Sequence, residues 1–354
     1  MECKRCLLDN RFPGITFNKE GVCAECTKFE KSWGKQVEDP SVFDKKQGQL
    51  RRILERYKKP GREFDCIIGT SGGSDSLYTL YLTKSVYGLN PLVVTVDTGF
   101  LSPEGKANVE KVCRELKVKH IYANPEFSTP IYKEFLQVTG NFCILCCYVV
   151  VYYIEKISRQ HNIRLIVGGL SRRTDPFLPY GTNYINLSYL IKNCRKKGIR
   201  HEILNTRSLL LTMFSLLRNN GLSIPDYVPW DKENNIKFLE KEFRIDLGKK
   251  KYDCTIFDFA NYIADRKYGL DHHFIEYCQM IRNGKLTREQ ALGKIHEAHG
   301  LDAQRLAYFL DYFNLTEEEI AKAMAYSKKL DGKLSFKFGQ LLRSLYLLHP
   351  KLHP

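Results

Sequence analysis

Residues 71–76 read SGGSDS and stand between an apolar run, FDCIIGT, and a segment with helical spacing, LYTLYL. Glycines in such a turn let backbone N–H groups converge on an anion, and the start of the following helix adds partial positive charge. The hydroxyls of Ser71 and Ser76 can donate to phosphate oxygens, while Asp75 can hold Mg²⁺ or orient the loop. The spacing is neither GxxxxGK[ST] nor GxGxxG. A tight, well-capped turn is the plain alternative, but a position after a buried strand favours a phosphate-binding loop.

The first 26 residues contain two CxxC pairs, Cys3–Cys6 and Cys23–Cys26. Four thiolates presented by two tight turns can close a tetrahedral shell around Zn²⁺, and this spacing is typical of structural zinc sites. We therefore predict a structural zinc module, with a redox pair or an iron–sulfur site as the alternatives.

A second group of thiols lies in NFCILCC, where Cys143 and Cys146 form a third CxxC and Cys147 follows directly. Cys254, in KYDC, is a distant partner for them. Three interpretations remain open: core packing, a second zinc site, and a catalytic thiol or metal cluster. The other cysteines lie in apolar or periodic contexts and are predicted to be packing residues: Cys66, Cys113, Cys194 and Cys278.

Two further stretches could contact a ligand. GGLSRRTDP begins at Gly168 and Gly169, which permit close backbone approach to a nucleotide, and its Arg172 and Arg173 suit phosphate or carboxylate binding. It could equally be a polar loop. The pair HH at 272–273 is predicted to start a helix on the surface.

The elements that would position these residues alternate between strand and helix. DCIIGT, PLVVTVDT, KHIYA and RLIVGG have strand character, and segments with helical periodicity separate them. This order predicts an α/β fold, a parallel sheet with helices on both faces. Such sheets bind ligands at the carboxyl ends of their strands, which is where SGGSDS stands.

The chain divides into three parts by pattern. Residues 1–35 are predicted to form the four-cysteine zinc module, residues 36–201 the α/β domain, and residues 202–354 a mainly helical C-terminal region. Strand signals fade from about residue 202. Capping boxes, Thr287 with Gln290 and Thr316 with Glu319, mark helix starts there.

Composition limits the class of protein. The 354 residues carry a formal charge of +15, which indicates either anionic partners such as nucleotides, nucleic acid or acidic sugars, or simply a solvated basic surface. No apolar run reaches the roughly 20 residues of a membrane span, and the start lacks a signal-peptide pattern, so a cytoplasmic protein is expected. In that compartment the 12 cysteines favour metal binding or chemistry over disulfides.

SGGSDS after one strand and VDTG at the end of the next resemble the PP-loop ATP pyrophosphatase superfamily. The resemblance implies an enzyme that cleaves ATP between the α- and β-phosphates, adenylates a substrate oxygen and displaces AMP with nitrogen or sulfur. It implies Asp97 near the nucleotide or its Mg²⁺. Many members have Lys where this chain has Ser74, which leaves Lys84, Arg172 or Arg173 to supply the charge. The implied ATP ligands are Ser71, Gly72, Gly73, Ser74, Asp75 and Ser76, with Gly168 and Gly169 close by.

Motifs along nearly the whole chain are similar to the N-acetyl sugar amidotransferase family. They are CKRCLLDNRFPGITFNKEGVCAEC, PWDKENNIKFLEKEF, KKKYDCTIFDFANYIADRKYGLD and IRNGKLTREQAL. The resemblance implies ATP-driven conversion of an acetamido to an acetamidino group in surface-polysaccharide or nonulosonic-acid pathways. It also implies ammonia supplied by glutaminase- and cyclase-type partner proteins.

The inner cysteines resemble those of PP-loop tRNA thiolases. In these enzymes three thiolates hold a [4Fe–4S] cluster whose open iron could bind hydrosulfide. Applied here, the pattern implies Cys143, Cys146 and Cys254 as cluster ligands and a sulfurtransferase acting on tRNA or a small molecule. A non-catalytic zinc-containing binding module is the third hypothesis, favoured by Ser74 alone.

Overall fold

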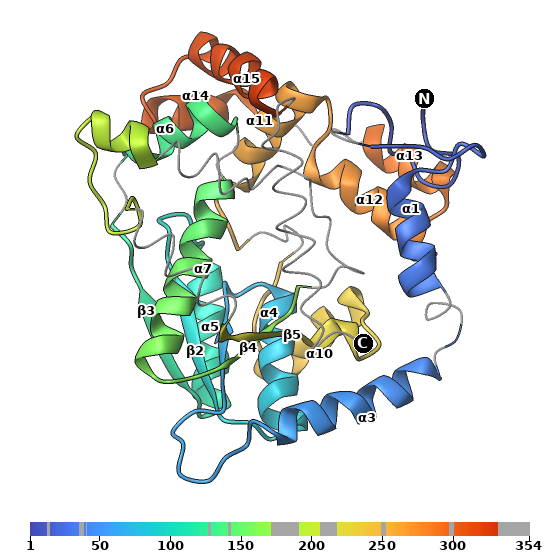
Figure 1. Ribbon diagram of the computed structural model, residues 1–354, viewed down its shortest axis with the longest axis vertical. Helices are drawn as coiled ribbons and strands as arrows, with labels where there is room; N and C mark the ends of the chain where they lie inside the picture. The colour runs from blue at the N-terminus through green and yellow to red at the C-terminus, as the bar shows by residue number, and fades with distance from the viewer. Residues whose placement is uncertain are drawn as a thin grey trace.

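The computed structural model describes residues 1–12, 15–34, 39, 41–126, 129–140, 143–170, 191–205, 218–248, 253–296 and 301–331. At its centre is a five-stranded parallel sheet with the order β3-β2-β1-β4-β5 (Figure 1). The predicted α/β class with a parallel sheet is therefore confirmed. The strands are β1 (Cys66–Gly69), β2 (Pro91–Val96), β3 (Lys119–Ala123), β4 (Leu165–Gly168) and β5 (Asn220–Ser223).

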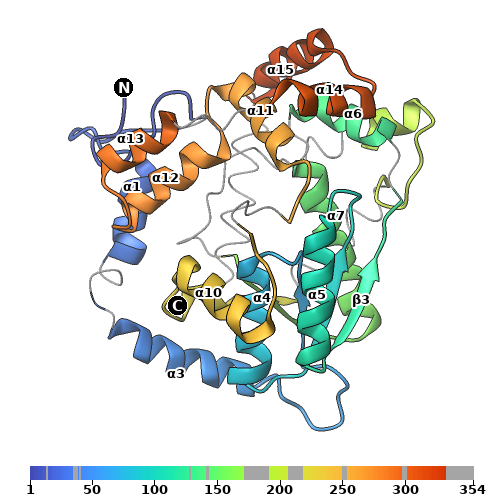
Figure 2. The same cartoon turned by 180° about the vertical axis from the view of Figure 1, so that it is seen from behind.

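Helices cover both faces of this sheet, as predicted (Figures 1 and 2). Around the sheet are α3 (Val42–Glu55), α4 (Ser74–Tyr81), α5 (Pro103–Glu115), α7 (Cys143–Gln160) and α10 (Lys232–Phe243). The others are α1 (Ala24–Phe29), α6 (Thr129–Thr139), α11 (Phe257–Tyr268), α12 (His272–Arg282), α13 (Arg288–His296), α14 (Ala303–Tyr312) and α15 (Glu317–Asp331).

Side chains that alternate between the two faces of the sheet form two apolar layers, one on each face. Ile68 of β1 lies in the layer that contains α3, α4, α5 and α10, whereas its neighbour Ile67 lies in the layer formed with α7. Because successive side chains of a strand point to opposite faces, both layers draw on the same short strands. Strands β1 and β2 are therefore buried on both sides, which explains their continuous apolar sequences, whereas the edge strands β3 and β5 are partly exposed.

The remaining helices form two further cores. One joins α6 and the start of α7 to α11, α14 and α15, and its largest fully buried rings are Phe135, Phe259 and Phe313. The other packs the N-terminal cysteines against α12 and α13. Both predicted capping boxes are present, since Gln290 and Glu319 each accept from the backbone N–H of the threonine three residues earlier.

Three local features differ from the sequence prediction. Strand β5 lies beyond residue 202, where strand signals fade; it is an edge strand with the sequence NGLS, and only Leu222 is buried. The pattern YVVVYYIEKISRQHN predicts a helix that begins after the cysteines, but helix α7 already begins at Cys143, so the CxxC occupies its first turn. Helix α6 has no counterpart in the predicted elements. Within the described ranges, no helix is long and apolar enough to cross a membrane.

A buried carboxylate on α7 makes the stability of the fold depend on pH. Glu155 accepts a hydrogen bond from the side-chain amide of Asn219. The other carboxylate oxygen of Glu155 and the side-chain amide oxygen of Asn219 are buried without a hydrogen-bond partner. Burial raises the pKa of Glu155 from 4.5 to about 7. The folded state therefore keeps this proton between pH 4.5 and 7, where the unfolded chain has lost it.

We expect the free energy of unfolding to fall as pH rises from 4.5 to about 7 and to level off above that, a loss of about 3 kcal/mol, because one pKa unit corresponds to roughly 1.4 kcal/mol. Glu155→Gln should flatten this dependence and stabilise the protein at pH 8. Denaturant unfolding at pH 5 and pH 8 measures both effects. Exposed Glu115→Gln is the control, and an unchanged pH dependence in Glu155→Gln would contradict the assignment.

Candidate functional site

The SGGSDS loop follows the end of β1, and its backbone packs closely against the start of α5. Gly72 has a φ of +88°, and a Cβ atom on it would lie 2.2 Å from the carbonyl oxygen of Gly105. Only glycine fits such an approach of two backbones. Gly73 is the N-cap of α4 and has an extended conformation, so the chain turns sharply into the helix.

The first N–H groups of α4 have no intrahelical partner and are available to an anion. The loop is braced from within. The Gly72 N–H donates to the Thr70 hydroxyl (3.3 Å), and that hydroxyl lies 2.8 Å from the Ser76 hydroxyl, which donates to the carbonyl of Gly73. Ser76 thus holds the loop in shape here, and its predicted bond to phosphate stays a prediction.

Asp75 and Gly169 meet where the strand order reverses between β1 and β4. The Trp230 indole N–H donates to one Asp75 oxygen (3.1 Å). A Cβ on Gly169 would lie 2.6 Å from the Asp75 carbonyl oxygen, so the end of β4 packs directly on α4, whereas a Cβ on Gly168 would meet nothing within 4 Å. Ligands of open α/β sheets bind at this kind of switch point.

Asp97 follows β2 and makes an ion pair with Lys106 of α5. Its other oxygen accepts the backbone N–H of Gly99 (2.9 Å), so both oxygens are engaged. Lys84 lies ten residues along from Ser74 and contacts Asn90, which puts it about 15 Å from the loop at 1.5 Å per helical residue. Arg172 and Arg173 lie outside the described residues. Lys106, paired with Asp97 at the end of β2, is one described cation on this side of the sheet, and Lys232 interacts with Asp253 beside the loop.

Two functional contacts went unnoticed in the sequence. Trp230, from the quoted motif PWDKEN, holds Asp75, and Asp253, from KYDC, accepts a hydrogen bond from Ser71. The Asp253 carboxylate lies 3.1 Å from where a Cβ on Gly73 would be. Burial raises the pKa of Asp253. Both residues stand inside motifs that the sequence analysis quotes, PWDKEN and KYDC, and this was the signal that could have found them.

The structure brings the inner thiols together at the carboxyl edge of the sheet. The Cys146 sulfur lies 3.8 Å from the Thr98 hydroxyl, just after β2, and charges on Cys143, Cys146 and Cys254 would repel one another. Burial raises the pKa of Cys146 to about 11 and that of Cys254 to about 12. Cys143, Cys146 and Cys254 are partly buried, Cys146 and Cys254 pack against the apolar core of α6, α7 and α11, and Cys147 is exposed.

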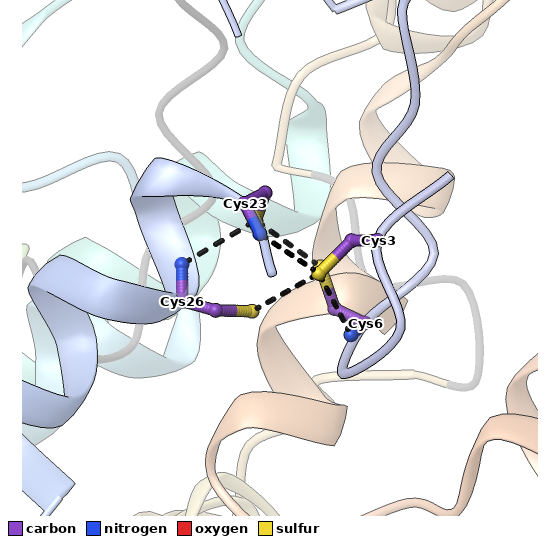
Figure 3. A group of neighbouring side chains, drawn as sticks. All are labelled: Cys3, Cys6, Cys23 and Cys26. Carbon is purple, nitrogen blue, oxygen red and sulfur yellow. Dashed lines mark hydrogen bonds between the residues drawn. The ribbon is translucent and has the colours of Figure 1, made fainter. Parts of the chain in front are cut away.

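By contrast, the N-terminal thiols form a compact shell (Figure 3). Cys3 and Cys26 sulfurs lie 3.9 Å apart, and Cys6 and Cys23 sulfurs 3.7 Å. A tetrahedron with metal–sulfur bonds of about 2.3 Å has edges of about 3.8 Å, so the donor set fits one metal ion. Among the described residues, this is the only group of three or more Cys, His, Asp or Glu whose ligand atoms lie within 4.8 Å of one another. The inner thiols therefore lack a closed single-ion shell.

Cations and helix α12 surround the metal shell. The Arg288 guanidinium donates to the carbonyls of Cys3 and Cys6, and Arg282 donates to the Cys6 sulfur (3.6 Å). Hydrogen bonds with Cys23, Cys26 and Cys278 lower the pKa of Cys6. The predicted packing cysteines are all buried: Cys66, Cys113, Cys194 and Cys278. His272 starts α12 as predicted, but it is half-buried against Phe257, and burial lowers its pKa to about 4.

Sequence comparison finds two relevant similarities. Residues 241–340 match the C-terminal domain of WbpG-like LPS biosynthesis proteins. An uncharacterized protein of Methanocaldococcus jannaschii is 24% identical over 293 residues, which cover 82% of this chain and 91% of that protein.

Similar solved structures include the U34-tRNA thiolase NcsA from Methanococcus maripaludis, with its [4Fe–4S] cluster. It is 15% identical, with a TM-score of 0.32, and the match covers 89% of this chain and 96% of that one. The ammonia-dependent NAD synthetase from Campylobacter jejuni is 14% identical, with a TM-score of 0.35, covering 83% and 96%. At these TM-scores, neither enzyme defines the activity of this chain.

Proposed function

We propose that this chain is an ATP-dependent enzyme of the PP-loop type that transfers nitrogen to an N-acetyl sugar. The observation that carries the proposal is the SGGSDS loop, wedged against α5 by Gly72 and standing at the switch point between β1 and β4. The N–H groups at the start of α4 would face an anion bound there, and the Ser71 hydroxyl, which interacts with Asp253, could be redirected to it. A triphosphate whose β- and γ-phosphates occupy this loop would present its α-phosphorus to a substrate.

The reaction would proceed in two balanced steps. The amide oxygen of the acceptor bonds to the α-phosphorus as the α–β anhydride breaks, and pyrophosphate leaves. Ammonia then attacks the activated carbon, loses a proton, and expels AMP with the former amide oxygen. The loop N–H groups stabilise the leaving charge, and positioning supplies most of the rate. Magnesium would neutralise the phosphates, and the Asp75 oxygen not bonded to Trp230 is its best ligand here.

Similarity to WbpG-like LPS biosynthesis proteins supports a polysaccharide-related acceptor. An N-acetyl sugar, free or nucleotide-linked, carries the amide that this chemistry needs. We propose that ammonia comes from glutaminase- or cyclase-type partner proteins in the cytoplasm. Lys106, paired with Asp97 at the neighbouring strand end, would supply the positive charge that Ser74 lacks.

The products of ATP distinguish this reaction from ordinary ATPase activity. With Mg²⁺, an ammonium salt and a panel of N-acetyl sugars, we expect one AMP and one pyrophosphate for each amidine formed. Anion-exchange chromatography of the nucleotides and a pyrophosphate assay measure both. ADP with orthophosphate as products would overturn the mechanism.

Two glycines with the same backbone strain test the loop. Gly72 and Gly61 have φ values of +88° and +82°, but a Cβ meets Gly105 only at Gly72 and nothing within 4 Å at Gly61. Gly72→Ala should lower pyrophosphate release by about 100-fold, since small misplacements of reacting groups cost that much. Gly61→Ala should retain turnover. Equal activity in both variants would remove the loop from the site.

Sulfur transfer is the second candidate, supported by the inner thiols beside Thr98. Cysteines on different irons of a [4Fe–4S] cluster lie further apart than thiolates on one ion, so the open arrangement of Cys143, Cys146 and Cys254 is compatible with three cluster ligands. Such a cluster would supply an open iron for hydrosulfide, and tRNA would be a possible acceptor. The formal net charge of the chain, +15, would favour binding of tRNA.

Protein purified without oxygen decides between these candidates. Nitrogen transfer predicts a colourless preparation free of iron; sulfur transfer predicts about four irons per chain, a broad visible absorption, and the loss of both in Cys254→Ser. Cys66→Ser, at a buried position on β1, is the control that should retain the iron.

We propose Zn²⁺ as the metal of the N-terminal shell, because four thiolates at these separations suit a closed, structural zinc site. We expect one zinc per chain by elemental analysis, and Cys6→Ser should lose it and lower the melting temperature. Cys113→Ser, at a buried position on α5, should keep the zinc. Full zinc content in Cys6→Ser would refute the site.

A further inference from the structure

We propose that Asp253 is a positioning residue that couples occupation of the phosphate loop to the reactivity of the Cys254 thiol. The proposal rests on the nucleotide site proposed above and extends it, because it joins that site to the inner thiols through two adjacent residues. Asp253 faces the loop and Cys254 faces the thiols.

The first step is the placement of an acid against an anion cradle. The Asp253 carboxylate accepts from the Ser71 hydroxyl and lies 3.1 Å from the Cβ position of Gly73. A bound polyphosphate would repel this carboxylate and compete for the same hydroxyl donor. Nucleotide binding must therefore change the surroundings of Asp253.

The second step is the backbone that carries Asp253. Residues 253–255 run antiparallel to residues 100–102, with a bridge between Leu101 and Cys254. The Ser102 N–H donates to the Asp253 carbonyl (2.8 Å), and the Thr255 N–H donates to the Phe100 carbonyl (2.8 Å). This pairing fixes both sides of Cys254, so a shift of Asp253 reaches the thiol through one peptide unit.

The same pairing also reaches the loop by a second route. Ser102 is the N-cap of α5 and accepts the Gly105 N–H (2.9 Å). Gly105 in turn packs its backbone on Gly72 and on the carbonyl of Ser71, which a Cβ on Gly105 would approach to 2.8 Å. Loop, helix start and Asp253 thus form one closed set of contacts.

At the other end of the coupling, Cys254 stands three residues before the first residue of α11 and packs, like Cys146, against the apolar core of α6, α7 and α11. Its thiol is partly exposed, so a reagent can reach it. Loading the nucleotide would then set the position of Cys254 relative to the other thiols before the acceptor is attacked.

Alkylation of the full chain tests the coupling. Iodoacetamide labelling of Cys254 would be followed by mass spectrometry with and without Mg²⁺ and adenosine 5′-(α,β-methylene)triphosphate, which cannot be cleaved between the α- and β-phosphates. We expect the nucleotide to change the labelling rate by about fivefold or more, the lower range of coupling between sites. Calorimetric titration of the same preparations measures nucleotide binding separately.

Asp253→Asn and Ser71→Ala should each abolish the change in labelling when compared at nucleotide concentrations that the titration shows to be saturating for each variant, since Ser71→Ala also loses a phosphate donor. Ser71→Ala breaks the contact from the other side, so the test survives poor folding of Asp253→Asn. Asp258→Asn, four residues beyond Cys254 and paired with Arg305, is the matched control and should respond like the wild type.

Binding without a change at Cys254 would overturn the coupling and leave the proposed function intact, as would a full response in both variants. Absence of nucleotide binding to the wild type would overturn both proposals.

Discussion

The structure depends on one close approach, between the backbone of the SGGSDS loop and the start of α5. Gly72 and Gly105 leave no room for a side chain at their contact, and Ser102 fixes the helix end that bears Gly105. Because the contact is backbone against backbone, the loop is held by atoms that no rotamer change can move. A cradle of N–H groups needs this rigidity, since a flexible turn would have to be ordered by each anion it binds.

Around this contact, the sheet brings together groups from distant parts of the chain. The order β3-β2-β1-β4-β5 puts the ends of β1, β2 and β4 side by side. The residues that follow these ends, SGGSDS, Asp97 and Gly169, therefore lie at the same edge of the sheet. Trp230 and Asp253 then close the site from the C-terminal half. The region similar to WbpG-like proteins, residues 241–340, thus contributes Asp253 to the loop and α12 and α13 to the metal shell.

The features that could be predicted from the sequence are those that depend on residues close together in the chain. Buried parallel strands are continuous apolar runs, and β3 occupies the predicted KHIYA; the capping boxes and the CxxC pairs are also local signals. Strand β5 was missed because NGLS on a sheet edge buries only Leu222 and has no apolar run. Contacts of Trp230 and Asp253 were missed for another reason. Each spans more than 150 residues, and only the fold determines such distances.

The two cysteine groups are similar in sequence but differ in physical character. The N-terminal thiols are buried, lie at tetrahedral separations and have Arg282 against the Cys6 sulfur and Arg288 against the backbone carbonyls of Cys3 and Cys6, an arrangement that suits a structural metal ion. The inner thiols are partly exposed, lie beside Thr98 at the edge where the nucleotide would bind, and are spread too widely for a single ion. A closed shell leaves no position for a substrate, whereas an open group at the catalytic edge does. Of the two proposed reactions, only sulfur transfer would use the inner thiols, because nitrogen transfer needs the SGGSDS loop and an acceptor amide alone, whereas the N-terminal shell packs against α12 and α13.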